Sequence, residues 1–126
     1  MEMHGNSLSS AQWAVMEHLW RSGSLTGREA TDVMEAEIGW NRSTTLTMLR
    51  RMEEKGFVRS TVNGGVKTFY PVLRREDAAM QVTENLLERV YHGSISMLLS
   101  ALTHKQNLSQ EEIHKLHALL DGMEGK

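Results

Sequence analysis

Apolar positions recur at helical spacing in the first forty residues, in two runs that each have clear start and stop signals. A capping box formed by Ser9 and Gln12 opens the first run, and Gly23 ends it; its apolar members are Trp13, Val15, Met16, Leu19 and Trp20. A second capping box, Thr26 with Glu29, opens a helix that continues to about Ile38 and carries Ala30, Val33, Met34 and Ile38. The pattern predicts two short amphipathic helices.

A third helix is expected over residues 42–55, with Asn41 as its cap and Gly56 as its stop. Spacings of three and four place its apolar face at Thr45, Met48, Leu49 and Met52. The opposite face then carries hydroxyl and arginine side chains, which is unusual because serine and threonine are poor helix formers.

Residues 57–62 and 66–72 are rich in β-forming side chains, and Asn63-Gly64 between them is a strong hairpin signal. Pro71 stands near the end of the second strand, where a missing N–H does little harm. Two short helices, a helix with a polar outer face and a two-stranded ribbon occur in the order of a winged helix-turn-helix. The expected fold class is therefore mainly α with a small β-hairpin.

Three further helices are expected after a linker at residues 73–77. They cover residues 78–91, a segment that begins after the Ser94 cap, and a last segment opened by a capping box at Ser109. So short a segment has difficulty forming a core of its own, and pairing with a second copy would bury its apolar faces. We expect a DNA-binding domain at residues 1–73 and a helical dimerisation domain at residues 74–126. The dimerisation positions are Leu86, Leu87, Val90, Ile95, Leu98, Leu99, Leu102, Ile113, Leu116 and Leu120.

The net charge of −2 conceals a basic middle segment. Residues 41–75 hold eight lysines and arginines against two glutamates, whereas the segments on either side are acidic. Such an excess indicates a local face that binds a polyanion. Helix N-termini with small hydroxyl side chains approach phosphates and base edges, and arginines hold phosphates or recognise guanine. The predicted DNA-binding residues are Arg42, Ser43, Thr44, Leu46, Thr47, Arg50, Arg51 and Lys67.

Thr44, Thr47 and Arg50 or Arg51 are expected nearest the bases, and Arg42, Ser43 and Lys67 at phosphates. Leu46 is the outward position that this hypothesis explains least, either contacting a thymine methyl group or standing apart from DNA. Trp13 and Trp20 are expected in the core, and the Trp40 indole could reach a phosphate. The alternative function is a winged helix that binds an acidic protein partner through the same basic face.

Other classes of function find little support in the sequence. The chain has no cysteine, which excludes disulfides and thiolate metal sites and favours the cytoplasm. It has no apolar run long enough for a membrane span, no catalytic motif, and no sign of a cofactor. Glu53 and Glu54 are adjacent on the helix, so we expect solvated carboxylates there and not a catalytic pair. His114 and His117 lie three residues apart, but no recognised ligand pattern joins them, and we expect no metal site.

Several segments resemble the penicillinase repressor family of bacterial transcription repressors, over about Leu8 to Asp121. The segments are "LSSAQWAVMEHLW", "GWNRSTTLTMLRRMEEKGFV" and "LSQEEIHKLHALLDG". The resemblance implies a homodimeric repressor of the kind that controls antibiotic resistance, in which the winged helix binds a palindromic operator. It further implies release from DNA by a regulatory protease or by metal. The chain departs from both modes: it lacks Cys-x-Cys motifs, and Ala101-Leu102 stands where that family is cut at Asn-Phe.

Overall fold

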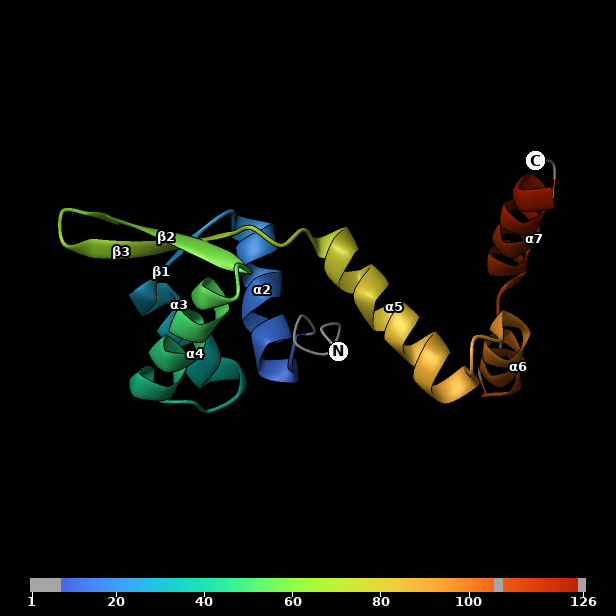
Figure 1. The fold of residues 1–126 in the computed structure, drawn as a ribbon, viewed down its shortest axis with the longest axis horizontal. Coiled ribbons are helices and arrows are strands. Elements are labelled where there is room, and N and C mark those ends of the chain that lie inside the picture. Colours follow the sequence, from blue (N-terminus) through green and yellow to red (C-terminus); the bar gives the residue numbers. More distant parts are fainter. Residues whose placement is uncertain (1–7, 106–107, 125–126) are drawn as a thin grey trace. The chain divides into compact units, whose positions relative to one another are not determined.

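The computed structural model describes residues 8–105 and 108–124, which the packing divides into two compact units between Thr83 and Glu84. The first unit contains three helices, α2 (Ser10–Ser22), α3 (Gly27–Glu37) and α4 (Arg42–Glu54), and the strands β1 (Leu25–Thr26), β2 (Val58–Asn63) and β3 (Val66–Pro71) (Figure 1). It also contains the start of α5 (Arg75–Tyr91), within which the division falls. The helices α6 (Ile95–Lys105) and α7 (Gln110–Glu124) belong to the second unit.

Local capping determines where the first three helices begin. Ser9 Oγ accepts the N–H of Gln12 at 3.2 Å while Gln12 Oε1 accepts the N–H of Ser9 at 2.9 Å. Thr26 and Glu29 form the same reciprocal pair, and Asn41 Oδ1 accepts the N–H of Thr44 at 2.9 Å. These hydrogen bonds confirm the predicted caps. Each cap stabilises its helix because it satisfies backbone donors that the first helical turn leaves unpaired.

One core joins these helices to the sheet. The inward face predicted for α4 is confirmed, since its four residues are buried and the helix packs against α3 and β2. The buried members of the core are Val15, Met16, Leu19, Leu25, Ala30, Met34, Met48, Leu49, Met52, Phe57, Val58 and Phe69. Ile38, predicted on the apolar face of α3, is 42% exposed because the helix ends at Glu37.

The sheet has three strands in the order β1-β3-β2, so the prediction of a two-stranded ribbon was incomplete. Strand β1 pairs Leu25 with Phe69 and Thr26 with Thr68. Two residues cannot display a strand period, and this strand exists only because β3 lies beside it. It directly precedes α3, so Thr26 serves as both strand residue and helix cap.

The turn of the wing lies one residue later than predicted. Asn63 pairs with Val66 in the ladder, and the loop is Gly64-Gly65, with φ angles of 61° and 82°. Glycine adopts these positive angles at the least cost, because it has no Cβ, and two successive positive φ values suit the twist of a hairpin. The wing is therefore the pair β2 and β3 with a Gly-Gly tip.

The predicted linker at residues 73–77 was wrong, because α5 already begins at Arg75. The Trp20 indole donates to the carbonyl of Leu73 at 2.8 Å, and Arg75 donates to Glu17 through Nε at 3.2 Å and Nη2 at 2.9 Å. The guanidinium also lies 5.9 Å from the ring centroids of Trp13 and Trp20. Both tryptophans, predicted in the core, are half-buried: Trp20 packs against the core, and both rings also border the start of α5.

The helices of the second unit are each well defined at their starts. Ser94 Oγ accepts the N–H of Met97 at 3.2 Å, and Ser109 Oγ accepts the N–H of Glu112 at 3.1 Å. His92 and Gly93 have positive φ angles of 51° and 84° and end α5 as predicted. Among the described residues of α5, α6 and α7, Ala78 alone is buried. Much of the apolar surface of these helices therefore faces solvent in a single chain.

The observed architecture is a winged helix-turn-helix followed by a helical segment, and the predicted fold class is confirmed. The boundary predicted between two functional domains at residues 73 and 74 stays a prediction.

Candidate nucleic-acid interface

Helix α4 has one face in the core and the other open to solvent. The polar residues predicted to point outward are exposed at Arg42, Ser43, Thr44, Arg50 and Arg51, whereas Leu46 and Thr47 are half-buried. The Asn41 cap places the N-terminal turn at the surface, where backbone N–H groups favour an anion. The exposed face thus combines hydroxyls, cations and a helix N-terminus.

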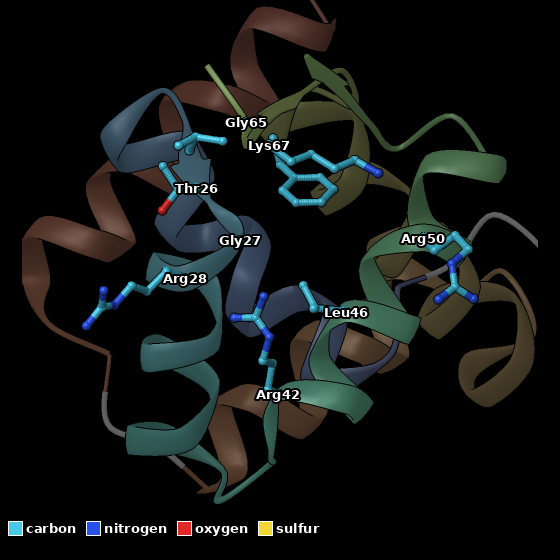
Figure 2. A pocket seen from close by; sticks show the side chains of 10 residues that line it. Thr26, Gly27, Arg28, Arg42, Leu46, Arg50, Gly65 and Lys67 are labelled. Atoms are coloured by element: carbon cyan, nitrogen blue, oxygen red, sulfur yellow. The ribbon is translucent and has the colours of Figure 1, made fainter. Parts of the chain in front are cut away.

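A hollow of about 550 Å³ lies between the start of α3, helix α4 and the wing, and we call it the wing hollow (Figure 2). Four cationic side chains line it together with an apolar floor. The lining residues are Thr26, Gly27, Arg28, Arg42, Leu46, Arg50, Gly65, Val66, Lys67 and Phe69. In Figure 2 the Arg42 side chain points into the hollow, whereas Arg28 extends away from it.

Leu46 belongs to the floor of the wing hollow. A Cβ atom placed on Gly27 would lie 3.6 Å from Leu46 Cδ2, so the leucine packs closely over the start of α3. It also packs against the buried core. An apolar residue at this outward position of α4 is explained by packing, because the Leu46 side chain contacts α3 and is half-buried.

A second hollow, of about 380 Å³, lies on another side of α4, and we call it the hydroxyl hollow. Helix α4 and the start of α2 contribute most of its lining. The lining residues are Ser9, Gln12, Trp40, Ser43, Thr44, Thr47, Met48 and Arg51. The outward side chains of α4 are thus divided between the two hollows. Arg42, Leu46 and Arg50 line the wing hollow. Ser43, Thr44, Thr47 and Arg51 line the hydroxyl hollow.

Glu53 was expected to be solvated, and that expectation is wrong. Ser60 Oγ of β2 donates to Glu53 Oε2 at 2.7 Å, and Lys67 Nζ of β3 lies 3.8 Å from Glu53 Oε1. Lys67 Nζ is also 5.4 Å from the centroid of the Phe69 ring. The end of α4 is therefore linked to both strands of the wing through one carboxylate.

Thr26, Gly27 and Arg28 also line the wing hollow, although none of them was predicted to lie at the interface. One available signal was electrostatic: a helix N-terminus disfavours a cation, yet Arg28 stands in the first turn of α3. A cation that the helix dipole disfavours is a candidate for binding an anionic ligand. The contribution of Ser9 and Gln12 to the hydroxyl hollow has no such signal, because their capping roles account for both residues.

Two other predicted features can be placed in the described part of the chain. His114 and His117 lie on α7, and residues 8–105 and 108–124 contain no group of three histidine, cysteine or acidic side chains that could hold a metal ion. Within the same residues, no helix is both long and apolar enough to cross a membrane.

The comparison with known proteins covers nearly the whole chain. A family model described as "Penicillinase repressor" matches residues 8–122. The methicillin resistance regulatory protein MecI of Staphylococcus aureus strain N315 is 25% identical over 114 residues, which cover 90% of this chain and 93% of that protein. The penicillinase repressor of Bacillus licheniformis is 26% identical over 114 residues, covering 90% and 89% respectively.

Solved structures support the same assignment. The DNA-binding domain of the repressor BlaI, known from a solution structure, has a TM-score of 0.51 and 27% identity, and the match covers 56% of this chain and 85% of that one. The YusO protein of Bacillus subtilis, with a TM-score of 0.52, 19% identity and coverage of 98% and 79%, supports the fold alone. The winged helix, its position in the chain and the family match over residues 8–122 together mean that this protein belongs to the penicillinase repressor family.

Proposed function

We propose that this protein is a homodimeric, sequence-specific DNA-binding repressor that binds a palindromic operator with α4 and the wing. The observation that carries the proposal is the position of α4 between two hollows with different polar linings. A major groove admits one α-helix, and a phosphate backbone borders it on each side. With α4 in the groove, the wing hollow would lie beside one backbone and the hydroxyl hollow beside the other.

The side chains divide into two roles under this proposal. Thr44, Thr47 and one of Arg50 and Arg51 approach base edges, since Thr44 and the arginines are exposed and Thr47 is half-buried beside them. Arg42 and Ser43 hold phosphates, and Arg28 joins them from the start of α3. Hydroxyl and cationic side chains of this kind provide most protein contacts to the DNA backbone.

Dimerisation is the function proposed for the second unit. Large apolar side chains are exposed there, including Val90 at 54%, Ile95 at 55%, Leu102 at 44% and Leu120 at 47%. A second copy that covered these faces would remove them from water, which is the main favourable term in association. Two winged helices joined in this way would bind half-sites about 10 base pairs apart or a multiple of that spacing. The derepressing signal is unidentified, and proteolysis in the second unit is one candidate.

The proposal can be tested by measuring affinity for duplex DNA as a function of salt. Arg50→Ala and Arg51→Ala should each weaken binding and reduce the slope of log affinity against log salt by about 0.9 when the lost contact is to a phosphate. Arg89→Ala, an exposed arginine on α5, is the matched control and should leave binding unchanged. Negligible affinity of the intact protein for duplex DNA at low salt would refute the proposed function.

A further inference from the structure

The basic segment contains one carboxylate that is bound to the wing. Residues 41–75 hold two acidic side chains, Glu53 and Glu54. Glu53 is half-buried and joined to Ser60 and Lys67, whereas Glu54 is exposed at the next position of the helix. The two glutamates therefore carry the same charge at nearly the same place, but only the first engages the DNA-facing wing.

The geometry holds the Glu53 carboxylate in one orientation. Ser60 pairs with Phe69 across the strands, and Lys67 lies two residues before Phe69, so the three share one face of the sheet. The Ser60 hydroxyl holds Oε2 at 2.7 Å, which leaves Oε1 directed toward the Lys67 ammonium at 3.8 Å. The Phe69 ring lies beside the same ammonium. Lys67 is thus paired before any ligand arrives.

The other cations of the wing hollow are not paired in this way. Within residues 8–105 and 108–124, Arg28, Arg42 and Arg50 have no carboxylate within ion-pair distance. Of the four cations that line the hollow, three are therefore available, with the Arg28 side chain directed away from it, and one has an internal counter-ion.

We propose that Glu53 lowers the sequence-independent affinity for DNA by withholding Lys67 from the DNA backbone. This inference rests on the proposed function. A free lysine that binds a phosphate releases one condensed counter-ion from DNA, and that release drives binding to any sequence. When Lys67 leaves Glu53 for a phosphate, the exposed carboxylate recruits a cation in its place. The two ion movements offset each other, so Lys67 adds little to sequence-independent affinity.

The consequence is a smaller electrostatic contribution to the binding of any duplex. Binding to an unspecific duplex relies on phosphate contacts alone, so a withheld cation lowers that affinity directly. Binding to the operator adds base contacts from α4, which do not involve Lys67. Glu53 thus lowers the backbone contribution for operator and random DNA alike, so that base contacts from α4 make up a larger share of operator affinity.

The decisive experiment compares Glu53→Gln with Glu54→Gln on a random-sequence duplex, by fluorescence anisotropy over a range of salt concentrations. Glutamine keeps an acceptor for Ser60, and a circular dichroism melt checks that each variant folds. Glu53→Gln should steepen the slope of log affinity against log salt by about 0.9, which is about a 3.5-fold greater loss of affinity over a fourfold rise in salt. Glu54→Gln should keep the slope of the unmodified protein.

Lys67→Met separates this mechanism from a general charge effect. In the unmodified protein it should leave the slope unchanged, and in the Glu53→Gln background it should remove the added 0.9. Equal slopes for the two glutamate variants, or a slope reduced by Lys67→Met alone, would overturn the inference while leaving the DNA-binding proposal intact. Absence of duplex binding by the unmodified protein would instead refute the proposed function itself.

Discussion

Two neighbouring threonines on α4 should respond in opposite ways to the same substitution. Thr45 is fully buried, and its hydroxyl has no hydrogen-bond partner among the described residues. Thr44 is exposed on the face proposed to contact DNA. Valine has nearly the same shape and helix propensity as threonine, so replacing either residue changes little besides the hydroxyl.

The magnitude for Thr45→Val follows from the burial of the hydroxyl. A buried polar group without a partner costs the folded state about 1–3 kcal/mol of desolvation, and 0% exposure means that solvent does not reduce this cost. Thr45→Val should therefore raise the free energy of unfolding by about 1–3 kcal/mol. For a unit of this size, each kcal/mol corresponds to about 4–8 °C in melting temperature. DNA affinity should stay constant, because the side chain faces the core.

Urea unfolding followed by circular dichroism measures the change, and Thr44→Val is the matched control. Thr44→Val should leave the unfolding free energy within about 0.5 kcal/mol, because surface substitutions of this kind have small effects. It should weaken DNA binding. A Thr45→Val protein that is equally or less stable would refute the reasoning, since it would mean that the Thr45 hydroxyl gains a hydrogen bond on folding.

Three further predictions concern other parts of the chain. The pKa of the Glu17 carboxyl is lowered from its ordinary 4.5, mainly by the hydrogen bond from Arg75 and secondly by the one from Trp13. The ionised carboxylate therefore stabilises the folded state above pH 4.5, and this contribution is lost as pH falls through the folded-state pKa. The stability difference between the unmodified protein and Arg75→Met, measured by urea unfolding, should therefore shrink below pH 4.5; a constant difference would contradict this. Gly56→Ala should lower stability by about 1–2 kcal/mol in a thermal melt, because φ there is +86°, and an unchanged melt would contradict that strain. Val90→Glu should convert a dimer to a monomer in analytical ultracentrifugation, and an unchanged mass would exclude Val90 from the interface.

The features that could be predicted from the sequence depend on local interactions. Caps at Ser9, Thr26 and Asn41 act over three residues. Their side chains therefore predict where the helices begin, whatever the tertiary fold. The inward face of α4 follows from spacing alone, because the helical period is intrinsic to the backbone. The polar outer face, and with it most of the candidate interface, was predictable for the same reason.

The features that could not be predicted depend on residues far apart in the sequence. Strand β1 is too short to have a period and exists through its pairing with β3. Helix α5 starts earlier than local signals indicate because Arg75 is held by Glu17, 58 residues away. Arg28 joins the candidate interface because the start of α3 lies beside the wing.

The sequence by itself determined which residues form helices, which faces are apolar and where positive charge gathers, since each depends on chain chemistry within a few residues. The tertiary structure alone decided how that charge is distributed. It placed Leu46 on the floor of a hollow and gave Lys67 a carboxylate partner from α4. Coulombic interactions act through space and fall off with distance, so the state of a cation depends on neighbours that only folding brings together.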